Sequence, residues 1–189
     1  MSSNGAPAVR RPARPTRLDQ LVEAARAAER AGAWDESLAH YEQAFSRLTR
    51  EGDAGRAAEL LRWIAAVHGE RGDLEVAGEL CEASLAVAEA SGAREHVAAA
   101  LNCLANVAQR AGRLGEAERF YRQARAIADE LGDVRLGAMV EQNLGTLANI
   151  RGDVSGALAS YASALERYRR LGDLRGAARA LNNMGMAHV

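Results

Sequence analysis

From Thr16 onward the chain alternates between apolar-rich segments of about fifteen residues and short breaks, each of which contains a glycine. These glycines recur every twenty residues, at Gly32, Gly52, Gly72, Gly92, Gly112, Gly132, Gly152 and Gly172. A glycine just past a helix adopts the left-handed conformation at little cost and closes the last turn. An aspartate, which suits the N-cap of a following helix, comes next at Asp53, Asp73, Asp133, Asp153 and Asp173. The pattern therefore predicts repeated, tightly turned helical hairpins.

Alternate segments are not equivalent, so the structural period is forty residues. Counted from every second glycine, the fifth residue is Ser37, Ala77, Ala117 or Ala157, and the ninth is Tyr41, Cys81, Tyr121 or Tyr161. Counted back seven residues, the position holds Ala25, Ala65, Ala105 or Gly145. Small residues recur where two helix backbones must approach, and a large ring recurs where a gap between hairpins must be filled.

Two stretches carry a family resemblance: LNCLANVAQRAGRLGEAERFYRQAR (101–125) and QNLGTLANIRGDVSGALASYASAL (142–165). They resemble tetratricopeptide repeats, whose commonest form has a shorter period than forty residues. The longer period is similar to that of kinesin light chains, Leu-Gly-Asn adaptors and bacterial peptide-sensing regulators. The resemblance implies an all-α fold, a right-handed superhelical α-solenoid of antiparallel hairpins. Cys81 departs from the pattern by replacing the aromatic residue of the second repeat, and Gly92 by lacking a following aspartate.

The resemblance covers residues 16–189, about four and a half repeats. The final stretch LNNMGMAHV matches the start of earlier repeats, so we expect the chain to be cut off within a fifth repeat. Residues 1–15 contain all three prolines and lack apolar periodicity, and we expect a disordered tail there. Its arginines leave two readings open, a basic arm for an acidic surface or a solvated leader.

Composition and charge exclude several function classes. The net charge of −1 creates no global attraction to nucleic acid or to an anionic membrane. All 24 basic residues are arginine, which rules out a Schiff-base or P-loop lysine. The sequence contains neither an apolar run long enough to span a bilayer nor the core of a signal peptide. We therefore expect a cytoplasmic protein without a membrane partner.

Candidate catalytic and metal-binding residues are sparse. Cys81 and Cys103 do not resemble a disulfide framework and lack the spacing of a metal site. Cys103 has no histidine in register with it, so we expect a passive small side chain rather than a reactive thiol. The four histidines fall on different predicted helices, and no HExxH, GxSxG or phosphate-binding glycine motif is present. We expect no enzyme, no cofactor and no metal.

Amide side chains recur on the predicted inner helices. The resemblance implies that the first helix of each repeat lines a concave groove. Before Gly112 that helix carries Asn102, Asn106 and Gln109 on one stripe. The matching groups on the next two first helices are Gln142, Asn143, Thr146 and Asn149, and then Asn182 and Asn183. We expect these residues to form an amide ladder on the face that packing leaves free, with Arg62 and Trp63 as a flanking anchor.

A carboxamide offers a donor and an acceptor together, so stacked amides can hold the main chain of a peptide. The leading hypothesis is a protein-interaction module that binds a peptide or partner segment in the groove, as the scaffold or sensor part of a larger bacterial protein. A simpler alternative is that the amides are merely solvated. A structural alternative is self-assembly into a homo-oligomer through the uncapped C-terminal helix. Binding of RNA is a third reading, which the net negative charge of the array opposes.

Overall fold

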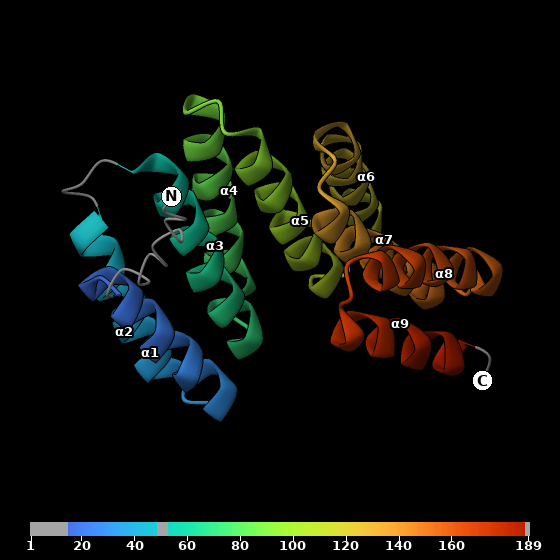
Figure 1. The fold of residues 1–189 in the computed structure, drawn as a ribbon, viewed down its shortest axis with the longest axis horizontal. Helices are drawn as coiled ribbons and strands as arrows, with labels where there is room; N and C mark the ends of the chain where they lie inside the picture. Colours follow the sequence, from blue (N-terminus) through green and yellow to red (C-terminus); the bar gives the residue numbers. More distant parts are fainter. Residues whose placement is uncertain (1–14, 49–52, 188–189) are drawn as a thin grey trace, which may run out of the picture.

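The computed structural model describes residues 15–48 and 53–187, and within those ranges it contains nine α-helices and no strand (Figure 1). The helices are α1 (Arg17–Ala31), α2 (Trp34–Leu48), α3 (Ala54–Arg71), α4 (Leu74–Ala90), α5 (Arg94–Arg110), α6 (Leu114–Leu131), α7 (Val134–Ile150), α8 (Val154–Arg170) and α9 (Leu174–Ala187). Four successive hairpins and one further helix confirm the predicted all-α architecture. Most of the predicted tail, Gly52, His188 and Val189 lie outside the described residues.

The turns follow the predicted chemistry. The seven described turn glycines all have positive φ, from +65° at Gly172 to +91° at Gly72. At the next helix, four aspartate side chains accept a hydrogen bond from the backbone N–H three residues on, at 2.9 Å; these are Asp53, Asp133, Asp153 and Asp173. Asp73 makes no such bond, and its carboxylate lies 3.3 Å from His68 Nδ1 instead. The aspartate prediction is thus confirmed at four of its five positions.

The recurring tyrosines fill the space between helices. Tyr41, Tyr121 and Tyr161 are 0%, 0% and 2% exposed. Small residues make room for them: a Cβ added to Gly145 would lie 2.6 Å from a ring carbon of Tyr161. Close packing of this kind explains why the small position and the aromatic position repeat together.

The helices form two layers. Each helix contacts the next along the chain, and in addition α3 contacts α5, α5 contacts α7 and α7 contacts α9. In a curved array, the helices on the inner side lie closer together than those on the outer side. Contacts between every second helix therefore mark the inner side of the curve. The odd-numbered helices therefore make the concave layer, and the even-numbered helices make the convex layer (Figure 1).

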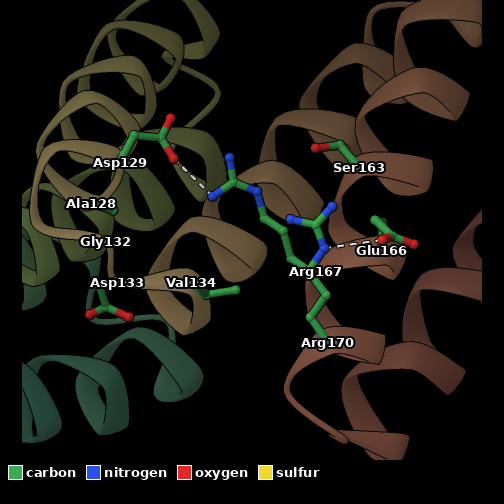
Figure 2. A pocket seen from close by; sticks show the side chains of 9 residues that line it. All are labelled: Ala128, Asp129, Gly132, Asp133, Val134, Ser163, Glu166, Arg167 and Arg170. Atoms are coloured by element: carbon green, nitrogen blue, oxygen red, sulfur yellow. Dashed lines mark hydrogen bonds and ion pairs between the residues drawn. The ribbon is translucent and has the colours of Figure 1, made fainter.

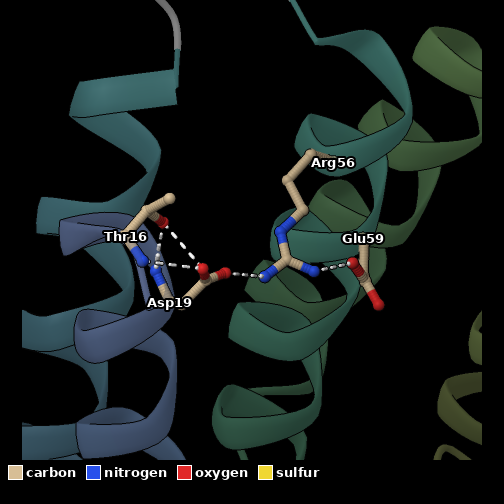
Figure 3. Close-up of polar contacts among 4 residues, drawn as sticks. All are labelled: Thr16, Asp19, Arg56 and Glu59. Atoms are coloured by element: carbon tan, nitrogen blue, oxygen red, sulfur yellow. Dashed lines mark hydrogen bonds and ion pairs between the residues drawn. The ribbon is translucent and has the colours of Figure 1, made fainter. Parts of the chain in front are cut away.

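Arginine side chains connect successive repeats. Arg167 of α8 reaches Asp129 of α6, with 2.8 Å between Nη1 and Oδ1 (Figure 2). It passes over Gly137 of α7, where a Cβ would overlap the guanidinium group. At the other end, Arg56 of α3 lies 3.6 Å from Asp19 of α1 (Figure 3). Such exposed pairs contribute little stability each, but they restrict how neighbouring hairpins lie against each other.

The prediction that the two cysteines do not pair is wrong. A disulfide joins Cys81 of α4 to Cys103 of α5, and their Cα atoms lie 6.0 Å apart. The forty-residue period explains the pairing. Tyr41 and Trp63, the equivalent residues one repeat earlier, also touch, with ring centroids 5.8 Å apart. Cysteines at these two positions therefore meet because the repeat always brings the positions together.

Candidate functional site

The concave layer carries most of the predicted amide ladder. Its members lie on α5, α7 and α9, which follow one another along the inner surface. Their exposure differs strongly: Asn106, Asn149 and Asn182 are exposed, and the other ladder residues are half-buried or buried. The ladder is therefore divided into side chains that face the groove and side chains that pack between the helices.

An amide cluster joins α5 to α7, and we define it as Asn102, Asn106, Gln109 and Asn143 together with Tyr121. The Asn143 Nδ2 group donates to Asn102 Oδ1 at 3.1 Å and to Asn106 Oδ1 at 3.2 Å. The Tyr121 hydroxyl lies 2.6 Å from Asn106 Oδ1 and 3.1 Å from Gln109 Oε1. Burial raises the pKa of Tyr121 above its ordinary value, so its hydroxyl keeps the proton that it donates.

Two members of the ladder depart from the expected free face: Asn102 is buried, so the prediction is wrong for it, and Gln142 is half-buried with a buried side-chain oxygen. Asn102 is 7% exposed and receives the Asn143 amide. The Gln142 Oε1 atom is buried and has no hydrogen-bond partner among the described residues. Both residues occupy the same place in their repeats, where neighbouring inner helices pack together. Superhelical curvature thus covers a position that a single straight helix would expose.

The remaining ladder residues keep free hydrogen-bonding groups. Both protein partners of the Asn106 side chain approach its oxygen, so its NH₂ group has no acceptor in the described part of the chain. The NH₂ group of Gln109 likewise has none there. Asn149 makes no side-chain hydrogen bond with a described residue, and Asn182 contacts only the Met186 sulfur, at 4.0 Å. Asn183 is half-buried and has no described side-chain hydrogen bond.

Thr146 is held from both sides. Its hydroxyl donates to the Gln142 carbonyl at 3.2 Å and accepts from the Tyr161 hydroxyl at 3.3 Å. The tyrosine of the first repeat makes a similar contact, because the Tyr41 hydroxyl donates to Glu29 at 2.7 Å. In three repeats, then, a tyrosine from the convex layer ends at a polar side chain of the concave layer.

Trp63 is not the exposed anchor that the sequence predicted. The indole is half-buried, and the guanidinium carbons of Arg26 and Arg56 lie 4.4 and 5.4 Å from its ring centroid. Arg62 is also half-buried, and burial lowers the pKa of its guanidinium group. Trp63 helps to hold α1 against α3 through its contact with Arg26.

The sequence reasoning missed a cavity of about 280 Å³ between α3 and α5. Ala65, Ala66 and Gly69 line it from α3, and Cys103, Asn106 and Val107 line it from α5. Gln109 and the ion pair between Arg110 and Glu70 complete the lining, with 3.0 Å between the charged atoms. The available signal was the small residue Cys81 at a position that holds tyrosine in the other repeats.

A larger cavity, of about 420 Å³, lies between α8 and the α6–α7 turn (Figure 2). Both of its arginines already form ion pairs, Arg167 with Asp129 and Arg170 with Glu166. The described residues contain no group of three or more His, Cys, Asp or Glu side chains arranged to hold a metal. Within the same ranges, no helix is both long enough and apolar enough to cross a membrane.

Comparison with known proteins supports the repeat assignment. Residues 56–130 match the sequence model of the tetratricopeptide repeat family. The predicted resemblance is thereby confirmed, because residues 56–130 match tetratricopeptide repeats. No curated protein matches the chain significantly by sequence.

Several solved structures share the fold. BtubC (BKLC) from P. vanneervenii is 20% identical, with a TM-score of 0.68 over 90% of this chain and 79% of that one. A Rap protein complexed with Competence and Sporulation Factor is 14% identical, with a TM-score of 0.80 over 90% of this chain and 48% of that one. The Rap conjugation gene regulator of the plasmid pLS20, in complex with the Phr* peptide, is 15% identical, with a TM-score of 0.70 over 90% and 53%. At these identities the similarity defines the fold.

Proposed function

We propose that this chain is a protein-interaction module that binds an extended peptide segment of a partner protein along its concave face. The observation that carries the proposal is the pair of free amide donors on Asn106 and Gln109. Tyr121 and Asn143 hold the carboxamide oxygen of Asn106, which leaves its NH₂ group to donate to a peptide carbonyl. Asn149, Asn182 and Asn183 would extend the same contact along the groove.

The buried part of the ladder has a different role in this proposal. Asn102 and Asn143 bind each other across α5 and α7, so they position the donors rather than contact the ligand. Positioning of this kind lowers the entropy that must be lost when the peptide binds. Trp63 acts in the same indirect way, by holding α1 against α3 through Arg26.

The fold comparison supports the type of ligand. The Rap regulator of pLS20 has the same fold, and its structure contains a bound peptide. In the two Rap proteins the similar region is about half of the chain. We propose that the array likewise serves as the sensor or scaffold part of a larger protein.

The test removes the donors and keeps the acceptors. Peptides are first selected on the wild-type protein from a phage-displayed library of random dodecapeptides, and the Kd of a synthetic winner is measured by calorimetry. The double change Asn106→Asp with Gln109→Glu keeps the side-chain oxygens that accept hydrogen bonds from Tyr121 and Asn143. It should weaken binding by roughly 10- to 100-fold, since two donors are lost.

The matched control is Gln123→Glu, which makes the same chemical change on an exposed residue of the convex helix α6. Its Kd should equal that of the wild type. Equal affinity of the double variant and the control would show that the amide donors are not the site. Failure to select any peptide would overturn the function itself.

Self-association through α9 is a second candidate function. Leu174 and Leu181, seven residues apart and thus on one helix face, are 82% and 51% exposed, and Met186 is 58% exposed. Exposed apolar groups on one face favour contact with another protein surface. Light scattering over a range of concentrations decides the matter, because a protein that stays monomeric throughout would exclude this candidate.

A further inference from the structure

The cavity between α3 and α5 lies where one repeat lacks a side chain that the others have. In the first, third and fourth repeats a tyrosine from the convex layer fills the corresponding space, and these are Tyr41, Tyr121 and Tyr161. The second repeat has Cys81 at this position. The disulfide that Cys81 forms with Cys103 is much smaller than a phenol ring, and the cavity lies beside it, against Cys103.

The polar residues that accept hydrogen bonds from the tyrosine hydroxyl groups are also missing from the second repeat. The Tyr121 hydroxyl ends at Asn106 and Gln109. Forty residues earlier, the corresponding residues are Ala66 and Gly69, and both line the cavity. Two small residues, Ala66 and Gly69, therefore line the cavity where the third repeat has Asn106 and Gln109, and Ala66 is exposed on the concave face.

The lining determines which chemical group would fit. The walls are formed by the apolar side chains of Ala65, Ala66 and Val107 and by the sulfur of Cys103. Arg110 and Glu70 neutralise each other in an ion pair at 3.0 Å, so no unpaired charge calls for a charged ligand. Polarizable sulfur makes favourable contacts with aromatic rings. An engineered cavity of about 150 Å³ holds benzene, so the roughly 280 Å³ present here admits a ring.

We propose that this cavity receives an uncharged aromatic side chain, phenylalanine in size and chemistry, from the peptide bound in the groove. This inference rests on the proposed function and adds a specificity subsite to it. The ring would enter from the concave side and lie beside Ala66 and Gly69, which correspond to the residues that the Tyr121 hydroxyl contacts in the third repeat. The free NH₂ groups of Asn106 and Gln109, which also line the cavity, would then donate to the carbonyl groups beside that residue.

The first experiment measures the ring alone. N-acetyl-phenylalaninamide is titrated into the 15N-labelled protein, with N-acetyl-alaninamide as the probe that lacks the ring. The aromatic probe should bind with a Kd on the order of 1 mM, at least about tenfold tighter than the alanine probe. The backbone resonances of Ala66, Gly69 and Val107 should shift most. Equal binding of the two probes, or shifts centred elsewhere, would overturn the proposal.

A plugged variant tests the cavity directly. Cys81→Tyr combined with Cys103→Asn reproduces the pair Tyr121 and Asn143 of the next joint. Ala65 leaves room for the new ring, because the equivalent residues Ala25 and Ala105 are also alanines. The control, Cys81→Ala with Cys103→Ala, removes the same two sulfur atoms and adds no ring. Circular dichroism verifies that both variants fold.

The plugged variant should lose at least about tenfold in affinity for N-acetyl-phenylalaninamide, and the control, which loses only the sulfur contacts, should lose clearly less. Undiminished binding to the plugged variant would refute the proposal. If the plugged variant does not fold, the backbone resonance shifts of the wild-type protein with the two probes test the proposal instead.

The selected dodecapeptides separate this inference from the proposed function. Replacing their aromatic residue by alanine should cost about 30-fold on the wild type and almost nothing on the plugged variant. Peptides that bind both proteins equally and tolerate the alanine would overturn the subsite while the peptide-binding function stands. If no peptide is selected, the function fails, and the assignment of the occupant to a peptide fails with it.

Discussion

Replacement of Tyr121 by alanine tests the physical basis of the repeat. The ring is fully buried among Ala105, Ala117 and Leu136 in the core between the third and fourth repeats. Loss of a buried aromatic side chain costs roughly 3–5 kcal/mol, because the transfer energy is lost and a cavity remains. The Asn106 oxygen would still accept a hydrogen bond from Asn143, so the loss of the tyrosine hydroxyl adds little to this cost.

A second substitution separates the ring from its hydroxyl group. Tyr121→Phe removes the hydroxyl contacts at 2.6 Å to Asn106 and at 3.1 Å to Gln109 and should cost about 1 kcal/mol. Arg122→Ala is the control, because this neighbouring side chain is 67% exposed and forms a surface ion pair, which predicts a loss of less than about 1 kcal/mol.

The measurement is the free energy of unfolding in urea, followed by circular dichroism. Repeat arrays can unfold in parts, so the two-state assumption is checked with a second probe, such as tryptophan fluorescence. A loss below about 1 kcal/mol for Tyr121→Ala would show that the ring does not fill the joint. The forty-residue packing argument would then be wrong.

Three further predictions test other parts of the structure. Gly145→Ala should destabilise the protein in urea unfolding, since the new Cβ would overlap the Tyr161 ring, whereas Gly115→Ala, in open space on α6, should stabilise it by up to about 1 kcal/mol. Asn143→Ala should cost about 1–3 kcal/mol in the same assay, because the buried Asn102 oxygen loses its donor; a neutral effect would contradict the amide cluster. The Gly156 N–H and then the Ser155 hydroxyl lower the pKa of Asp153 below 3.8. Its contribution to stability is therefore present above that pH and lost below it, so the melting temperature should fall from about pH 5 to pH 3, and less so in Asp153→Asn.

The local elements could be predicted because their signals are local. A glycine with positive φ and an aspartate at the N-cap each act within one turn of a helix. The helical hairpins, the forty-residue period and the buried tyrosines were therefore readable from the spacing of residues alone. The pairing of Cys81 with Cys103 was readable in principle, since Tyr41 and Trp63 occupy the same two positions.

The tertiary structure decided which of the candidate residues are free to bind. Asn102 and Asn106 are four residues apart and share a stripe on an isolated helix, yet one is buried against α7 and the other is exposed. Packing and curvature of the inner helices make that difference, and neither is a property of a single helix. The cavity depends on Ala66 and Gly69 of α3 and on Cys103 of α5, which meet only when the two inner helices pack together. Sequence periodicity determines which positions are equivalent, and packing between repeats determines what each position can contact.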